Sequence, residues 1–257
     1  MFDSTEVLLG GHNLQQEFGL YLVKIDSGIT EGHFGITQSI IEDSVENIDT
    51  PFFYGVKREP FTFQATFVRQ KEWDFKTRLE FNEIVFKRHY QEFISADYPY
   101  ILYRVICVDE PNKVFFGEQG GYVSLNFRTD SPYAWSPVSV QNYDLSQNIT
   151  KTTIQVKNRS NVIDFYYPQM EFTLLEGSDI SFKNLTDGGR EFTFTGLLPN
   201  ETVSIDNQWQ IIKTDVPNVY RYVNCNRQWL RLRKGVNYIE ITGKCYLSFR
   251  LQVPIAI

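Results

Sequence analysis

Cysteine is scarce in this sequence, and its scarcity excludes two kinds of architecture. Only three cysteines are present, Cys107, Cys225 and Cys245, an odd number without any Cys-x-x-Cys spacing. A disulfide framework needs paired cysteines, and a structural zinc site needs closely spaced ones. We therefore expect reduced, buried thiols, with no metal and no cofactor.

Long apolar runs are also missing. No window approaches the ~18 consecutive apolar residues of a membrane-spanning helix. The first residues, MFDSTEVLLGGHNL, lack the basic segment and the apolar stretch of a signal peptide. We expect a protein that is made in a cytoplasm, is not exported and has no membrane partner.

Positive charge is in short supply, because the formal net charge is -6. A nucleic-acid-binding surface needs a concentrated basic patch, so nucleic-acid binding is not expected as the main function. The charge is also uneven along the chain. Residues 1–140 carry 20 acidic and 12 basic side chains, whereas residues 141–257 carry 11 and 13. This difference in sign indicates two units that should be treated separately.

Catalytic motifs are absent from the sequence. The three histidines, His12, His33 and His89, have no neighbour at metal-ligand spacing, and no P-loop, nucleophile elbow or dinucleotide fingerprint occurs. We therefore expect no catalytic residue and no enzyme. A glycosidase-type carboxylate pair leaves little local trace, so that alternative stays open.

A carbohydrate platform is a second alternative, because aromatic faces stack on sugar rings. Four aromatic residues in the second half are candidates for it: Trp209, Trp229, Tyr220 and Tyr222. The competing interpretation is that a tryptophan in a β-sandwich belongs to the core.

Aromatic residues are plentiful, at 16% of the chain, and most lie in alternating runs. In the segment 60–68, Phe61, Phe63 and Phe67 share one face, and polar side chains occupy the other. This pattern predicts a mainly β protein.

One long helix is expected at about residues 72–88, which contain no glycine or proline, begin with acidic residues and end with basic ones. At about 100° per residue, its apolar side chains form two stripes. One stripe consists of Trp73, Phe81, Ile84 and Val85, and the other of Phe75, Leu79 and Phe86. Two stripes predict two partners, the second within the chain or on a neighbouring subunit.

Prolines in the segment 131–137 end the first half, so we expect domains at 1–137 and 138–257. After Val138, short candidate strands recur every 8–12 residues or so, separated by turn signals such as Asp187-Gly188-Gly189. Among them are the segments 171–175, 180–182, 219–223, 238–241 and 246–253. This spacing is typical of a β-sandwich.

The order of several short motifs resembles the distal tail proteins of siphophages, ring-forming components at the tip of long non-contractile tails. In the first half the likeness rests on the helix led by Trp73 and on the motifs Phe18-Gly-Leu-Tyr21, Asp97-x-Pro99, Gly121-Tyr-Val-Ser-Leu-Asn-Phe127 and Tyr133-Ala-Trp-Ser-Pro137. In the second half it rests on Tyr167-Pro168, Ile180-Ser-Phe-Lys-Asn184, Gly196-Leu197, Glu201-Thr-Val-Ser-Ile-Asp206 and the closing segment 230–241. The segment Leu232-Arg-Lys-Gly235 departs from many relatives, which have proline before the glycine; the turn remains but is less rigid.

The resemblance implies a β-sandwich-like N-terminal domain with one flanking helix and a C-terminal sandwich that is galectin-like or carbohydrate-module-like. Six copies of the first domain would form a ring continuous with the tail tube. The stripe of Phe75, Leu79 and Phe86 would then meet the adjacent subunit, and the weakly patterned segment 26–49 would contact neighbours. Implied partners are the tail tube protein, a tail-associated tip or lysin protein and a receptor-binding protein, while DNA passes an acidic lumen without specific binding.

The expected function is therefore a structural hub in the virion, at the phage tail tip, for host attachment and DNA passage. The alternative is a carbohydrate-binding module or adhesin that recognises bacterial cell-wall polysaccharide through its C-terminal domain. A glycan-processing enzyme is a third interpretation, for which the sequence offers no constellation of residues.

Overall fold

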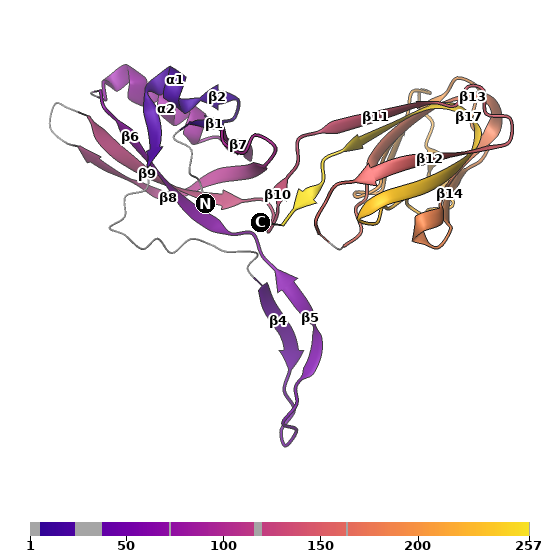
Figure 1. The fold of residues 1–257 in the computed structure, drawn as a ribbon, viewed down its shortest axis with the longest axis horizontal. Coiled ribbons are helices and arrows are strands. Elements are labelled where there is room, and N and C mark those ends of the chain that lie inside the picture. Colours follow the sequence, from indigo (N-terminus) through magenta and orange to yellow (C-terminus); the bar gives the residue numbers. More distant parts are fainter. Residues whose placement is uncertain (1–5, 24–37, 72, 116–119, 163, 257) are drawn as a thin grey trace. The chain divides into compact units, whose positions relative to one another are not determined.

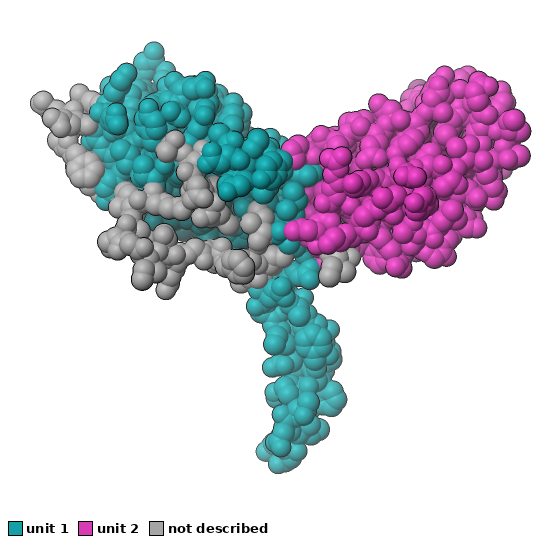
Figure 2. All heavy atoms as spheres, viewed as in Figure 1, with its two compact units in different colours: residues 1–136, 255–257 teal, residues 137–254 magenta. Residues whose placement is uncertain are grey.

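The computed structural model describes residues 6–23, 38–71, 73–115, 120–162 and 164–256. The chain divides into two compact units, residues 1–136 with 255–257 (unit 1) and residues 137–254 (unit 2), shown in Figure 2. The sequence-based boundary at residue 137 assigned residues 255–257 to the second domain instead. Both units are built mainly from antiparallel strands, as the sequence predicts.

Unit 1 contains a nine-stranded sheet with the order β2-β1-β7-β8-β9-β6-β3, to which β10 and β18 add off this path. Its strands are β1 (Val7–Leu9), β2 (His12–Asn13), β3 (Leu20–Val23), β6 (Thr62–Arg69), β7 (Gln91–Ser95), β8 (Leu102–Phe115), β9 (Gly121–Thr129), β10 (Ala134–Trp135) and β18 (Pro254–Ile255). Two helices, α1 (Leu14–Phe18) and α2 (Phe75–Val85), accompany this sheet.

The core of unit 1 follows from the alternation in β6. Phe63 lies opposite Phe127 of β9 in the ladder. The rings of Phe63, Phe93 and Phe127 form a cluster, with centroid distances of 5.5 Å (Phe63–Phe93), 5.9 Å (Phe63–Phe127) and 5.6 Å (Phe93–Phe127). This cluster of three rings therefore joins the strands β6, β7 and β9.

Strands β4 (Gln38–Asp43) and β5 (Phe52–Arg58) form a separate two-stranded sheet (Figure 1). The sequence suggested a weakly patterned segment at 26–49, but the part from residue 38 onward begins with a regular strand. Ile40 pairs with Val56, and Ile41 with Gly55. Residues 26–37 of the expected segment lie outside the described residues.

Unit 2 contains a seven-stranded sheet with the order β11-β17-β13-β15-β16, in which β12 also pairs with β17 and β14 with β13. Its strands are β11 (Ser139–Asp144), β12 (Lys151–Asn158), β13 (Gln169–Asn184), β14 (Arg190–Phe194), β15 (Thr202–Asp206), β16 (Ile211–Thr214) and β17 (Gly235–Leu251), with 3-10 turns η2 (Leu185–Asp187) and η3 (Arg221–Val223).

Two long strands, β13 and β17, run through both layers of unit 2. One layer also contains β11, β15 and β16, and the other contains β12 and β14. The first part of β13 pairs with β15 and the last part with β14, while β17 pairs first with β12 and then with β11. Irregularities between Leu174 and Ser181 interrupt the β13–β17 ladder where the two strands pass from one layer to the other. Two predicted pairs of short strands, 171–175 with 180–182 and 238–241 with 246–253, are thus each one continuous strand, because bulges bend a strand without ending it. The predicted strand 219–223 is wrong, since residues 221–223 form η3.

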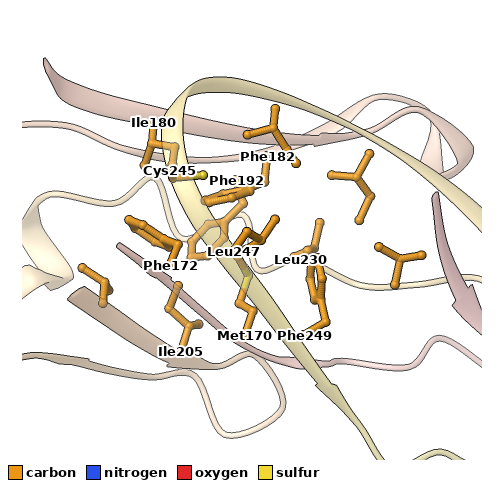
Figure 3. Packing of buried hydrophobic residues seen from close by; sticks show 14 of the residues in the cluster. Met170, Phe172, Ile180, Phe182, Phe192, Ile205, Leu230, Cys245, Leu247 and Phe249 are labelled. Carbon is orange, nitrogen blue, oxygen red and sulfur yellow. The ribbon is translucent and has the colours of Figure 1, made fainter. Parts of the chain in front are cut away.

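The core of unit 2 lies between these layers (Figure 3). Phe172 from one part of β13 meets Phe182 from the other part at a ring-centroid distance of 5.2 Å, and it meets Phe194 of β14 at 5.5 Å. Cys245, Leu247 and Phe249 of β17 add to the same buried cluster.

Candidate subunit interface

Helix α2 begins at a well-formed cap. Asp74 accepts hydrogen bonds from the backbone N–H of Thr77 (2.8 Å) and from the Thr77 hydroxyl (2.7 Å). These bonds lower the pKa of Asp74, so the cap stays ionised and favours the positive end of the helix dipole. The helix ends at Val85, because Phe86 leaves the helical conformation with φ -95° and ψ 48°. It is therefore shorter than the predicted 72–88.

The inner face of α2 is buried in unit 1. Trp73, which precedes the helix, and Phe81, Ile84 and Val85 belong to the core cluster. Phe81 packs edge-on against Phe18 of α1 at 5.8 Å and against Trp73 at 5.4 Å. This stripe anchors the helix to its own chain.

The opposite face carries three exposed apolar side chains, which we call the outer stripe. Phe75 is 68% exposed, Leu79 50% and Phe86 45%. Beside this stripe lies a depression of about 280 Å³, lined by Trp73, Arg78, Phe81, Asn82, Phe86, Val123 and Leu125. An apolar stripe next to a hollow suits an incoming side chain from a partner. The role of the stripe in a contact between copies stays a prediction.

The β4–β5 hairpin presents a second apolar surface. Ile40, Ile41, Phe52, Phe53, Tyr54 and Val56 are all between 45% and 64% exposed. At the base of the hairpin, Arg58 donates a hydrogen bond to the Tyr133 hydroxyl and lies 5.8 Å from the centre of that ring. An isolated two-stranded hairpin has marginal stability in water, so a surface of this kind gains from a partner.

The hairpin was missed at the sequence level, although two signals for it were present. Apolar Ile40-Ile41 and Phe52–Val56 flank a polar segment, and Asn47 in that segment takes the left-handed conformation with φ 68°. A turn residue between two apolar runs indicates a hairpin. The hairpin also carries exposed acidic side chains, Glu42 and Asp43 at the end of β4 and Glu46 and Asp49 in the connection.

The four aromatic residues of the predicted carbohydrate platform differ in how far they are buried. Trp209 is 75% and Tyr220 82% exposed, whereas Trp229 is 7% exposed and stacks on Phe192 at 5.4 Å. Tyr222 packs against the core, and its hydroxyl accepts a hydrogen bond from the Ile212 N–H at 3.1 Å. The structure thus leaves Trp209 and Tyr220 as the exposed members of the set.

The described residues of the kinds that commonly act as metal ligands or nucleophiles include His12, His89 and the three cysteines. His12 Nδ1 is 2.8 Å from Glu17 Oε2, His89 is exposed, and His33 lies outside the described residues. No disulfide joins the cysteines, and burial raises the pKa of Cys245 to about 12 and that of Cys107 to about 11. Both thiols are therefore protonated near neutral pH.

The described residues contain neither a candidate metal site nor a candidate membrane-spanning helix. In that part of the chain, no group of three or more His, Cys, Asp or Glu side chains is placed to hold a metal ion. None of the helices described is long and apolar enough to cross a membrane.

Comparison with known families accounts for nearly the whole chain. Residues 5–131 match the family described as "Phage tail protein N-terminal domain", and residues 133–251 match "Phage tail C-terminal domain". The chain belongs to this family of phage tail proteins and is a structural component of the virion.

Individual relatives and solved structures resemble the chain over nearly its whole length. The SPbeta prophage-derived uncharacterized protein YomH of Bacillus subtilis (strain 168) is 22% identical over 91% of both chains. The solved structure of the Dit (gp 19.1) protein of phage SPP1, described as a hub of the adsorption apparatus in phages that infect Gram-positive bacteria, matches with a TM-score of 0.70 at 13% identity. That match covers 96% of this chain and 98% of the other. A chain of the phage P2 baseplate matches over the same shares with a TM-score of 0.50 and 8% identity. The chain thus has the Dit-like fold.

Proposed function

We propose that six copies of this chain form a ring at the distal end of a phage tail. The ring would join the tail tube to a tip protein and to the receptor-binding apparatus. The chain would be made in the cytoplasm of the bacterial host and would catalyse no reaction. One observation carries the proposal: unit 1 presents two different apolar surfaces, the outer stripe of α2 and the β4–β5 hairpin.

Two different surfaces on one chain suit a ring. In a two-fold dimer the same patch meets itself, whereas a head-to-tail contact needs one surface to meet a different one. A head-to-tail contact closes into a ring when the rotation between neighbours divides a full turn. We therefore assign the hairpin of one copy to the outer stripe of the next.

Charge supports this pairing. The hairpin carries Glu42 and Asp43 at the end of β4 and Glu46 and Asp49 in its connection, while Lys87 and Arg88 follow the helix and are exposed. Opposite charges at the rim of an apolar contact select the partner and its orientation. The excess of acidic residues in the first half also suits a lumen that repels DNA phosphates as the genome passes.

Mass measurement in solution, combined with negative-stain imaging, tests the ring. We expect rings of six copies for the unmodified chain. Leu79→Asp or Phe86→Asp should leave a soluble monomer, because an unpaired carboxylate would be buried in every contact. Loss of the leucine burial alone is worth about 2 kcal/mol, or roughly 30-fold in affinity, per contact.

Lys76→Asp is the matched control, since Lys76 is exposed on α2 outside the outer stripe and its substitution changes the charge by more than Leu79→Asp does. It should assemble normally. A chain that remains monomeric at all concentrations and salts, and with its tail neighbours present, would overturn the ring. Turnover of any substrate would overturn the absence of catalysis.

A further inference from the structure

The solvent face of one layer of unit 2 is hollowed into a groove. One depression of about 390 Å³ is lined by residues of all five strands of this layer. Among them are Gln169, Glu171, Asp206, Lys213, Ser248 and Arg250. A second depression of similar volume is lined by Asn142, Tyr143 and Asp144 with Thr173, Tyr246 and others. Glu171 and Ser248 line both depressions, so the two form one groove.

The register of the strands arranges the polar side chains of the groove in rows that cross the sheet. In one row, Arg250, Gln169 and Asp206 lie side by side on β17, β13 and β15. In the next row, Asn142, Ser248, Glu171, Ser204 and Lys213 follow one another across all five strands. Five strands at about 4.8 Å spacing give rows about 19 Å long, which suits an elongated ligand.

Hydrogen bonds within the rows fix the side chains in place. Arg250 Nη1 donates to Gln169 Oε1 at 2.9 Å, and Gln169 Nε2 donates to Asp206 Oδ2 at 2.9 Å. In the second row the Ser204 hydroxyl donates to Glu171 Oε2. Side chains held by one another lose little freedom when a ligand arrives, which favours binding.

An aromatic residue is tied to the same network. The backbone N–H of Trp209 donates to Asp206 Oδ1 at 2.9 Å, so the carboxylate that lines the groove also fixes the turn that carries Trp209. Trp209 is exposed, and the exposed Tyr246 lines the other depression. Tryptophan and tyrosine combine an apolar face with a polar edge.

The balance of charge selects the class of ligand. The first depression contains two carboxylates, Glu171 and Asp206, and two cations, Lys213 and Arg250. Anionic polymers are bound by concentrated positive charge, which this face lacks. A hydroxyl group both donates and accepts, so a polyhydroxylated ligand suits a face on which amide, hydroxyl, carboxylate and guanidinium groups alternate.

We propose that this groove binds a neutral oligosaccharide that lies across the strands of unit 2. The proposal goes beyond the ring and does not depend on it, because every residue invoked belongs to unit 2.

Titration of the full-length chain with oligosaccharides, monitored by saturation-transfer NMR, tests the groove. The probes are neutral tetrasaccharides of hexoses and of N-acetylhexosamines, with poly(glycerol phosphate) as the anionic alternative. We expect at least one neutral probe to bind. Gln169→Ala should weaken binding about tenfold, because it removes the central member of a row. Ser248→Tyr should abolish binding, because Ser248 lines both depressions and tyrosine would fill them.

Gln155→Ala is the matched control, because Gln155 is exposed on β12 of the other layer and should leave binding unchanged. Thermal unfolding of each variant shows that it is folded before its affinity is compared. Absence of binding by every neutral probe would overturn the proposal. So would binding that ignores both groove substitutions, or binding of poly(glycerol phosphate) alone that salt abolishes.

Discussion

Glu201 and Arg221 form a buried ion pair in unit 2. Arg221 donates to both carboxylate oxygens of Glu201, from Nε at 2.8 Å and from Nη2 at 2.6 Å. The Leu198 N–H (2.9 Å) and the Thr214 hydroxyl (2.6 Å) donate to the same carboxylate. The pair therefore ties η3, which belongs to no ladder, to the paired strands β15 and β16.

Replacement of Glu201 by glutamine should cost about 3 kcal/mol of unfolding free energy, because Arg221 would keep its charge in the interior without a counter-ion. Urea unfolding monitored by tryptophan fluorescence measures this loss. Glu176→Gln is the control: Glu176 pairs with Lys244 at 2.7 Å on the surface, and its substitution should cost less than about 1 kcal/mol. Equal losses for the two variants would contradict the importance of burial.

The same carboxylate gives unit 2 a dependence on acid. Burial raises the pKa of Glu201, but hydrogen bonds from Arg221, Thr214 and the Leu198 N–H outweigh burial and leave it below the usual 4.5. A lowered pKa in the folded state means that the pair stabilises the fold fully above pH 4.5, and that this stability is lost as the pH falls through the folded-state pKa. The difference in Tm between the unmodified chain and Glu201→Gln should therefore shrink below pH 4.5. A difference that is constant down to pH 3 would contradict this origin.

Asn237 shows how much of a residue-level motif the sequence could predict. The turn at Leu232-Arg-Lys-Gly235 is expected to be less rigid, because no proline precedes its glycine. The structure supplies the missing rigidity: Asn237 Oδ1 accepts from the Arg233 N–H at 2.8 Å, and its Nδ2 donates to the Arg233 carbonyl at 2.8 Å. Asn184 from β13 donates to the same oxygen at 3.2 Å. That last contact spans 53 residues, so no local pattern could show it.

At the scale of elements, helical periodicity separated the two faces of α2 correctly, because side-chain direction follows from 100° per residue. The helix ends were less predictable, since Asp74 and the conformation of Phe86 decide them. The segments 171–175 and 180–182, like 238–241 and 246–253, are expected as separate strands, but β13 and β17 continue through the residues between them. Gly177 and Gly243 adopt φ angles of 82° and 112° there, which lets each strand bend and continue.

The hairpin element can be tested separately from α2. Phe53→Asp should prevent ring assembly and leave the Tm unchanged, because Phe53 is exposed and supports no core of its own chain. Thr50→Asp adds the same charge at an exposed polar position in the connection between β4 and β5 and should assemble normally. Size-exclusion chromatography with light scattering compares the two. A Phe53→Asp variant that still forms rings would remove the hairpin from the contact.

At the scale of the whole molecule, the sequence predicted a mainly β fold, the family and a structural role in the tail. These follow from local alternation and from the order of motifs, both of which are readable along one chain. The groove of unit 2 was not predicted, because each of its rows takes residues from as many as five strands. Alternation shows that Gln169 and Glu171 share a face, but only the pairing of strands brings Arg250 and Asp206 beside Gln169.

The two ends of unit 2 lie together. Ser139, at its start, pairs with Leu251, near its end, and the strands that bracket it in the chain, β10 and β18, pair with each other in unit 1. Unit 2 is therefore an insertion between two neighbouring strands, with its entry and exit at one seam. Because both connections of unit 2 lie side by side, this unit can be exchanged without interrupting any strand of unit 1. Recombination at the segments 136–138 and 252–254 would then replace unit 2 and leave the strands of unit 1 intact.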